Sequence, residues 1–152
     1  MITSLRDAQD SDKLFILNLR NRLEVYQGFY NQGYLGKGII TWDEHVEWWY
    51  SRFNWRRFII QTNSIDVGGI NIGQLDSWCP QVGIFIEPTY WGKGVGKQAL
   101  SLALSWLEER GYSAVQTTIL KDNERSIRLF EGLGFKRIGD GRKGEYWYAR
   151  RL

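Results

Sequence analysis

A glycine-rich turn between an apolar segment and a helical one constrains the fold of this chain more than any other feature. Residues 84–97 read IFIEPTYWGKGVGK, so a buried strand ends near Pro88 and a helix starts shortly afterwards. The turn contains Gly92, Lys93, Gly94, Gly96 and Lys97. Amide N–H groups at a helix N-terminus are unpaired and carry partial positive charge, and glycine leaves them open because it has no Cβ. The turn therefore predicts a site for an anion such as a phosphate.

Two common phosphate-binding motifs fit this turn poorly. A Walker A loop needs glycine at position 91 and Ser or Thr at position 98, where this chain has Trp91 and Gln98. Residues 94–99 do match the dinucleotide pattern G-x-G-x-x-A. That fingerprint, however, opens a first strand–helix–strand unit and is followed about 20 residues later by an acidic side chain. Here it lies late in the chain, and Gln116 and its neighbours are not acidic, so dinucleotide binding is kept only as an alternative.

Hydrophobic periodicity places an α+β fold around this turn. Apolar residues three and four apart predict helices at 12–23, 41–53, 99–107 and 126–133, and short β-rich runs predict strands at 2–6, 57–62, 65–75, 82–87, 112–120, 135–139 and 145–151. The turns between the strands of residues 57–87 are short, so these neighbours are antiparallel, because a parallel crossover needs about a dozen residues or more. We expect a mixed, mostly antiparallel sheet of about seven strands with about four helices.

Length and composition indicate one globular domain over residues 1–152. Hydrophobic residues make up 43% and charged residues 24% of the chain, which excludes a disordered protein. No apolar run approaches the roughly 20 residues that span a bilayer, and the first residues do not resemble a signal peptide. A single cysteine cannot form an internal disulfide. We therefore expect a cytoplasmic protein with no membrane partner.

The rarest residue types limit the chemistry. Cys79 and His45 are the only cysteine and histidine, too few for a four-ligand zinc site, and we expect no metal. A Ser-His or Cys-His nucleophilic site would need His45 as its base. His45 lies in a predicted amphipathic helix, where we interpret it as structural, with a substrate contact as the alternative. The net charge of +3, with a pI near 9.0, is too small and too scattered along the chain to indicate a nucleic-acid partner. It is compatible with an anionic small ligand.

A second motif follows the glycine-rich turn. Residues 123–135 read NERSIRLFEGLGF, in which Asn123 caps a helix and Gly134 ends it. This segment resembles the N-x-x-(S/A)-x-x-(L/F)-(Y/F)-x-x-x-G-F motif of the GCN5-related N-acetyltransferases (GNAT). The turn resembles the pyrophosphate loop of the same family, Q/R-x-x-G-x-G/A, although Trp91 departs from the usual Gln or Arg. Two motifs in this order, separated by a helix and a strand, make the chain similar to a GNAT domain.

The resemblance implies a three-layer α/β/α arrangement, within the α+β class, and acetyl-CoA as the co-substrate. In this family two neighbouring parallel strands splay apart, and the pantetheine arm of acetyl-CoA pairs with the exposed strand edge. Here those strands are 82–87 and 112–120, and Lys121 is an alternative to Arg128 for the adenosine phosphate. Carried onto this sequence, the residues implied in binding acetyl-CoA are Ile84, Phe85, Ile86, Trp91, Gly92, Lys93, Gly94, Val95, Gly96, Lys97, Asn123 and Arg128.

The implied reaction is transfer of an acetyl group to a primary amine by direct attack on the thioester, with backbone donors polarising the carbonyl. A base takes the proton of the amine, and an acid can protonate the leaving thiolate. Many members of the family have Tyr where this chain has Phe130, and some have Glu near Thr118, so other residues must serve here. The candidate bases are Glu87, Asp76 and Glu47 and the candidate acids Tyr148 and Tyr146, of which we place Glu87 and Tyr148 first.

Aromatic residues concentrate in one part of the chain: 11 of the 23 lie between Tyr26 and Phe58. Trp48, Trp49 and Tyr50 are consecutive, so on a helix they cannot all face one core. At least one of them is expected to face a cleft or a partner, such as a second copy in a homodimer. Aromatic faces suit sugar rings and nucleobases, although a small domain can also simply pack with tryptophan.

Two short segments narrow the substrate further. Residues 19–22 (LRNR) and 40–48 (ITWDEHVEW) resemble parts of nucleotide-linked amino-sugar N-acetyltransferases, which act in pseudaminic acid and related surface-glycan pathways. This resemblance implies a small-molecule amine contacted by Arg20, Asn21, Trp48 and Trp49. The alternatives are a ribosomal-protein-type acetyltransferase of protein N-termini, a dinucleotide-binding protein and a non-catalytic acyl-CoA binder. An extended groove favours the peptide acceptor, whereas a closed aromatic pocket with a cationic rim favours the nucleotide sugar.

Overall fold

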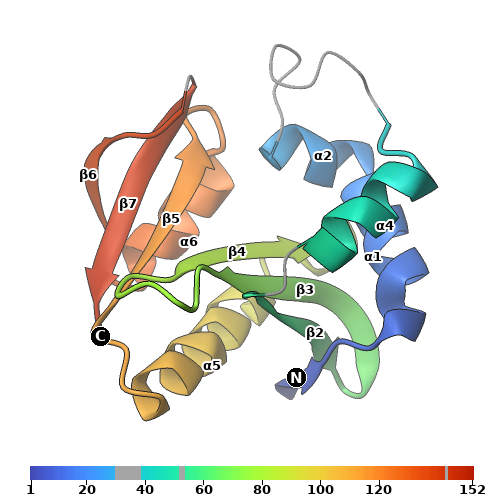
Figure 1. Cartoon of the computed structure of the whole chain (residues 1–152), viewed down its shortest axis with the longest axis horizontal. Coiled ribbons are helices and arrows are strands. Elements are labelled where there is room, and N and C mark those ends of the chain that lie inside the picture. Colours follow the sequence, from blue (N-terminus) through green and yellow to red (C-terminus); the bar gives the residue numbers. More distant parts are fainter. Residues whose placement is uncertain (30–38, 52–53, 143) are drawn as a thin grey trace.

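A seven-stranded sheet forms the centre of the computed structural model, which describes residues 1–29, 39–51, 54–142 and 144–152. The strands are β1 (Thr3–Asp7), β2 (Arg56–Thr62), β3 (Ile65–Gly73), β4 (Gln81–Ile86), β5 (Ala114–Leu120), β6 (Lys136–Asp140) and β7 (Glu145–Arg151). They lie in the order β1-β2-β3-β4-β5-β7-β6 (Figure 1). Every neighbouring pair is antiparallel except β4 and β5, which confirms the predicted mixed, mostly antiparallel sheet.

Helices cover both faces of this sheet. In the described part of the chain they are α1 (Lys13–Arg20), α2 (Leu23–Phe29), α4 (Trp42–Ser51), α5 (Val95–Glu109) and α6 (Glu124–Gly132). The apolar stripe of α5 recurs every three or four residues and packs on β3 and β4 in one core, which also contains Phe130 of α6. Side chains on the opposite face of the sheet, such as Ile59 and Phe85, pack against α1, α2 and α4 in a second core. The predicted three-layer α+β fold is therefore confirmed.

The parallel strands β4 and β5 separate after a single pair. Their register pairs only Gln81 with Gln116. Two contacts fix this junction: the Gln116 amide N–H donates to the Pro80 carbonyl over 2.9 Å, and the Thr117 hydroxyl donates to the Val82 carbonyl over 2.7 Å. Beyond these residues the register contains no further pair between the two strands. The predicted splay between neighbouring parallel strands is thus present, and it opens toward the turn that leads into α5 (Figure 1).

The prediction of one continuous helix over residues 12–23 is wrong, because the structure has two helices there. α1 ends at Arg20 and α2 starts at Leu23. The side chain of Asn21 explains the break, because its amide donates to the Ile40 carbonyl and accepts from the Ile40 amide, each over 2.9 Å. This reciprocal pair stabilises a bend at Asn21 rather than a continuous helix. None of the helices in the described ranges is long and apolar enough to cross a bilayer.

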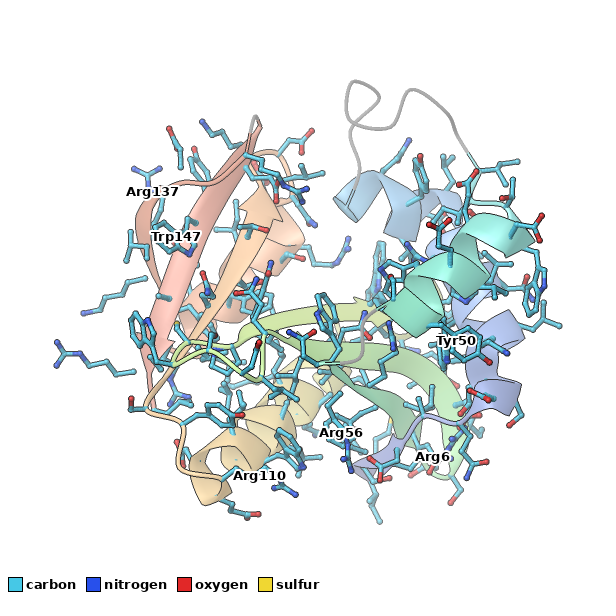
Figure 2. The ribbon with its side chains drawn as sticks, viewed as in Figure 1. Arg6, Tyr50, Arg56, Arg110, Arg137 and Trp147 are labelled. Atoms are coloured by element: carbon cyan, nitrogen blue, oxygen red, sulfur yellow. The ribbon has the colours of Figure 1, made fainter. Side chains whose placement is uncertain are left out.

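The three consecutive aromatic residues of α4 face three different surroundings. Trp49 is buried in the second core, Trp48 is half-buried beside a cavity, and Tyr50 is exposed on the outer side of the helix (Figure 2). This outcome follows the helical geometry expected from the sequence. Of the other aromatic residues in the cluster, Tyr30, Tyr34 and Phe53 lie outside the described residues.

His45 joins α4 to α1 and is completely buried. Its Nε2 lies 2.8 Å from the carbonyl oxygen of Lys13, which can only accept, so Nε2 carries the proton. Nδ1 is then the acceptor for Nη1 of Arg20, at 2.9 Å. Burial and the positive charges of Arg20 and Arg57 lower the pKa of His45 to about 4, although its bond to the Lys13 carbonyl acts in the opposite direction. The imidazole is therefore neutral near pH 7 and structural, as expected.

We expect the stability of the domain to depend on this histidine in acid. The pKa of His45 is about 4 in the folded chain and near 6.5 when exposed, so the unfolded chain binds more protons between these values. The free energy of unfolding contributed by His45 is complete above about pH 6.5 and falls as the pH drops toward about 4. Urea unfolding across this range measures it.

His45→Gln is the control for this prediction, because glutamine offers an amide donor and an acceptor but does not titrate. The stability of the variant should fall less steeply than that of the wild type over the same pH range. Parallel curves for the two proteins would contradict the prediction.

Candidate functional site

Two adjoining cavities occupy the opening between β4 and β5. The first encloses about 500 Å³ and the second about 320 Å³. Both are lined by Ile84 and Phe85 of β4 and by Asn123 and Ser126 at the start of α6. Since these four residues are shared, the cavities form one continuous cleft along the exposed edge of β4.

The glycine-rich turn forms the far end of the second cavity. Gly92 and Gly94 adopt φ angles of +72° and +82°, which favour glycine, and the space where a Cβ would stand is open at both. α5 begins at Val95, directly after Gly94, so its first amide N–H groups lie at this turn. The turn is thus a backbone cradle with the partial positive charge of a helix N-terminus beside it.

Trp91 and Arg125 form a stacked pair beside this cradle. The indole Nε1 of Trp91 donates to the Ile86 carbonyl over 2.9 Å, which fixes the ring at the end of β4. The guanidinium carbon of Arg125, from α6, lies 3.2 Å from the centre of the indole. Burial and the nearby Arg128 lower the pKa of Arg125, so an anion in the second cavity would stabilise its charge. Trp91 therefore positions a cation from another helix.

The backbone of β4 alternates between its two edges. The Glu87 amide donates to the Val67 carbonyl on β3, so residues of this parity, including Phe85, direct their backbone groups toward β3. The groups of Val82, Ile84 and Ile86 consequently face the opening toward β5. Within the opening, the Val82 carbonyl accepts from Thr117 and the Ile86 carbonyl accepts from Trp91. The Ile84 backbone lies between these two fixed points and lines both cavities.

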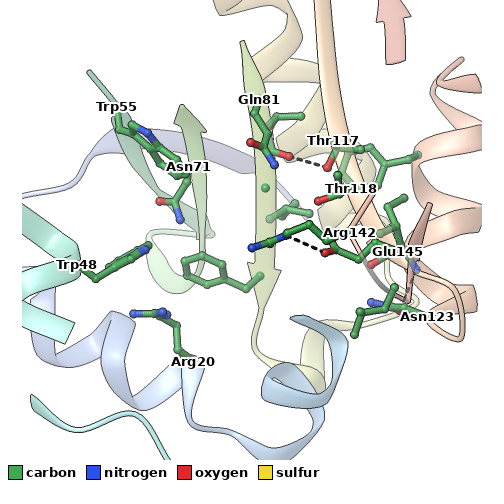
Figure 3. A pocket seen from close by; sticks show the side chains of 18 residues that line it. Arg20, Trp48, Trp55, Asn71, Gln81, Thr117, Thr118, Asn123, Arg142 and Glu145 are labelled. Atoms are coloured by element: carbon green, nitrogen blue, oxygen red, sulfur yellow. Dashed lines mark hydrogen bonds and ion pairs between the residues drawn. The ribbon is translucent and has the colours of Figure 1, made fainter. Parts of the chain in front are cut away.

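The first cavity has two opposite walls above β4 (Figure 3). One wall comes from α1, α4, β3 and the residue before β2, and it consists of Arg20, Trp48, Asn71 and Trp55. The other comes from β5, α6 and the start of β7 and includes Thr117, Thr118, Asn123, Arg142 and Glu145. Gly83 of β4 lies between them, and the space beside its Cα is open.

Arg20 is the charged group of the first wall and is nine-tenths buried. Besides its bond to His45, its guanidinium carbon lies 4.0 Å from the centre of the Trp48 ring, which His45 also stacks on. Asn71, from β3, is equally buried and points its amide into the cavity (Figure 3). This wall therefore combines one cation, two indole rings and one amide.

The opposite wall contains the one carboxylate among the described residues that line the first cavity. Glu145 is buried, and its Oε1 lies 3.1 Å from Nε of Arg142, forming an ion pair. It is the partner of Leu120 in the β5–β7 register, two pairs away from Thr118, and therefore on the same face of the sheet. A carboxylate thus reaches the neighbourhood of Thr118 from β7 rather than from β5.

The structure brings together most of the residues that the sequence places around acetyl-CoA. Those that line one or both cavities are Ile84, Phe85, Ile86, Trp91, Gly92, Gly94, Gly96, Lys97, Asn123 and Arg128. Lys93 and Val95 do not line either cavity, because Lys93 is exposed near the Tyr90 ring and Val95 is buried in the α5 core. Lys121 also lies outside both cavities, paired with Asp140 at 3.4 Å.

Glu87 and Tyr148, the preferred base and acid from the sequence, line neither of the two cavities. Glu87 follows β4 and is ion-paired with Arg22. Tyr148 lies on the face of β7 that packs toward α6, where its hydroxyl donates to Glu131 over 2.9 Å. Burial and this carboxylate raise the pKa of Tyr148, which makes it a weaker acid. The period of two along a strand places Tyr146 on the same distant face.

The other candidate bases also lie outside the lining of both cavities. Glu47 is exposed on α4, and Asp76 accepts from the Asn54 amide over 2.9 Å in the turn after β3. Phe130 does line the first cavity, where it meets Phe135 edge to face. Its ring has no proton to give, as the sequence indicates.

Two of the four predicted substrate residues line the first cavity. Arg20 and Trp48 do, whereas Asn21 is paired with the Ile40 backbone and Trp49 is packed in the second core. The sequence reasoning missed Asn71, Trp55, Glu145 and Arg125. A polar residue inside the apolar β3 pattern was the available signal for Asn71. The position of Glu145 depends on the β5–β7 register, which no local pattern encodes.

A comparison with protein families identifies the kind of domain that contains this cleft. The acetyltransferase (GNAT) domain family matches residues 3–136. The chain belongs to this family. The prediction of a GNAT acetyltransferase domain is therefore confirmed, whereas the amino-sugar branch stays a prediction.

Relatives of the chain extend the comparison. The uncharacterised protein MJ1062 of Methanocaldococcus jannaschii is 38% identical over 153 residues, which cover 97% of this chain and 31% of that protein. The chain thus spans about a third of the length of this relative. A crystal structure of a domain from the same organism is 37% identical, with a TM-score of 0.91 and 99% coverage of both chains.

A more distant structure shows the same fold with ligands. Spermidine N-acetyltransferase from Vibrio cholerae, in complex with CoA and spermine, has a TM-score of 0.80 at 18% identity, with 99% of this chain and 94% of that chain covered. The predicted co-substrate of this GNAT domain, acetyl-CoA, agrees with the CoA of that complex. In residues 1–29, 39–51, 54–142 and 144–152, no group of three or more His, Cys, Asp or Glu side chains gathers as a metal site would require.

The residues present fit acetyl-CoA. Its pyrophosphate needs close backbone approach and positive charge, which Gly92, Gly94, Lys97 and Arg125 offer around the second cavity. Its pantetheine arm carries amides that can pair with a strand edge, and the Ile84 backbone faces the opening as such an edge.

Arg125→Ala should lower the affinity for CoA about tenfold, because it removes a charge-assisted contact while the Trp91 bond to β4 remains. Calorimetric titration with CoA measures the change. Arg110→Ala is the matched control, since Arg110 stacks on Trp106 at 3.8 Å near the other end of α5 (Figure 2). Equal losses in the two variants, or full affinity in Arg125→Ala, would contradict this placement.

Proposed function

We propose that this domain is an acetyl-CoA-dependent N-acetyltransferase that modifies the primary amine of a small molecule. The observation that carries the proposal is the edge of β4, which lies open between a backbone anion cradle and the first cavity. In this proposal the acyl donor occupies the second cavity and the acceptor occupies the first. Acetyl-CoA supplies an acetyl group that its thioester already activates.

Backbone groups of β4 orient the acyl donor in this proposal. Ile84 and Ile86 direct N–H groups into the opening, where they can donate to the pantetheine amides and to the acetyl carbonyl. Gly83 offers room for the incoming amine, because no side chain occupies the space beside its Cα. The amine nitrogen forms a bond to the acetyl carbon as the carbon–sulfur bond breaks.

We assign proton removal from the amine to Glu145. It is the carboxylate among the described residues lining the first cavity, and it lies two register pairs from Thr118, on the same face of the sheet. The carboxylate takes the proton directly or through one water, and solvent can protonate the thiolate that leaves. Arg142 holds the carboxylate at the cavity wall.

A nucleotide-linked amino sugar is the acceptor that we propose within this class. Arg20, Trp48 and Trp55 support it, because indole faces suit a sugar or a base and the guanidinium suits a phosphate. The acceptor side is a cavity of about 500 Å³ lined by two indole side chains and a guanidinium, and these side chains favour this acceptor over a protein N-terminus.

Titration with acetyl-CoA, with NADPH as a control, tests the proposal first. Both compounds carry adenosine and a pyrophosphate, so binding of acetyl-CoA alone supports the acyltransferase cleft, and binding of NADPH alone would overturn it. Gly94→Trp should abolish acetyl-CoA binding, because the ring fills the cradle.

Gly111→Trp is the matched control for this variant. Gly111 also has a positive φ, +85°, and open space around it, but it follows α5 at the opposite end of the helix. Both substitutions introduce the same kind of backbone strain, so strain alone would affect the two variants equally. Because only Gly94 lies at the proposed ligand site, only Gly94→Trp should lose acetyl-CoA binding. A folded Gly94→Trp variant that still binds acetyl-CoA would contradict the assignment of the turn.

Glu145→Gln should lower kcat by about 10²-fold, because it removes the proposed base. The affinity for acetyl-CoA should not change, and the variant should recover rate toward alkaline pH, where the amine loses its proton in solution. Release of the CoA thiol across a pH series measures both effects. Glu87→Gln serves as the comparison: if it loses more activity than Glu145→Gln, Glu87 is the base and our assignment is wrong.

A further inference from the structure

The first cavity carries more positive than negative charge. The described residues in its lining include two arginines, Arg20 and Arg142, and one carboxylate, Glu145. Arg142 and Glu145 form an ion pair with each other on one wall, at 3.1 Å. Among the described residues that form the opposite wall, Arg20 is the one that carries a charge. A polycation such as spermine would meet this charge with unfavourable repulsion.

The guanidinium of Arg20 is held in a defined orientation. Its Nη1 donates to Nδ1 of His45, which can accept because the Lys13 carbonyl holds the ring proton on Nε2. The guanidinium carbon of Arg20 lies 4.0 Å from the centre of the Trp48 ring, and that of Arg57 lies 4.5 Å from the same ring centre. These contacts orient Arg20 without removing its charge. A cation that is fixed in advance loses less conformational entropy when it binds an anion.

Further polar and aromatic groups extend this wall toward β4. Asn71 lies on β3, is nine-tenths buried and points its amide toward the cavity. Trp55 packs closely against Gly73, since a Cβ added to Gly73 would lie only 2.3 Å from the indole. Gln81 lies between Asn71 and the opposite wall (Figure 3). A ligand on this wall thus meets one cation, hydrogen-bonding amides and two indole side chains.

We propose that the acceptor amine carries an anionic group, a phosphate or a carboxylate, that binds to Arg20 while its body packs against the wall that Trp48 and Trp55 help to form. This inference rests on the proposed function and specifies its substrate class. With the anion on this wall, the amine extends across Gly83 toward the wall of Glu145. The acceptor class differs from that of the spermidine acetyltransferase of the same fold, whose ligand is polycationic.

Matched acceptors test the proposal through release of the CoA thiol. One pair is a hexosamine 6-phosphate and the parent hexosamine, and a second pair is an ω-amino acid and its methyl ester; spermidine is the polycationic comparison. The anionic member of at least one pair should show a kcat/KM at least about tenfold higher than its neutral partner. The two pairs distinguish a phosphate from a carboxylate.

Substitution of Arg20 links the preference to this wall. Arg20→Gln should remove the preference for the anionic acceptor by raising its KM, Arg20→Lys should keep part of it, and Arg110→Gln should keep all of it. Acetyl-CoA affinity, measured for each variant, shows whether the domain is folded. If Arg20→Gln does not fold, the Arg20→Lys variant and the wild-type preference still decide the question.

Direct binding separates this inference from the proposed function. Wild type and Arg20→Lys are titrated with the hexosamine phosphate alone, without acetyl-CoA. Weaker binding to Arg20→Lys supports the anion subsite even if acetyl-CoA does not bind, in which case the proposed function alone fails. Acetylation with no preference for anions, a preference for spermidine, or a preference that survives in a folded Arg20→Gln variant would overturn the inference.

Discussion

The separation of β4 from β5 is the constraint on which the rest of the structure depends. A strand inside a sheet satisfies its backbone groups on both edges, and an unsatisfied buried group is costly. Here the junction at Gln81 and Gln116 ends the pairing, and Thr117 and Trp91 satisfy the Val82 and Ile86 carbonyls on either side. The groups of Ile84 remain directed into a cleft. The sheet thus keeps its register while leaving a short length of edge for a ligand.

The wall opposite β5 depends on a neutral histidine in the protein interior. A charged imidazole at His45 could not accept from Arg20, because both ring nitrogens would then be donors. Burial therefore stabilises the form of His45 that positions Arg20, and the same contact attaches α4 to α1. Packing of the helices and chemistry of the cavity are coupled through one side chain.

Local patterns predicted much of the fold, and tertiary pairing decided the rest. The glycine-rich turn and the start of the 123–135 segment depend on their own local backbone, so their positions around the second cavity could be inferred from sequence. The position of Tyr148 could not be inferred in this way, because whether a strand residue faces α6 or the cleft depends on the register of the β7 pairing. The same register brings Glu145 to the cavity. The break at Asn21 likewise depends on Ile40, which lies 19 residues away in the chain.

The two sides of the cleft come from separate stretches of the chain. The cradle, the open strand edge and the start of α6 lie between residues 82 and 130, whereas Arg20, Trp48 and Trp55 come from the first 55 residues. Under the proposed function, mutations of Arg20, Trp48 or Trp55 would change which amine is admitted while the glycine-rich turn that is proposed to hold the acyl carrier stays the same. Such a division allows acceptor choice to diverge rapidly between relatives whose donor site stays the same, which is a structural route to new substrates on one scaffold.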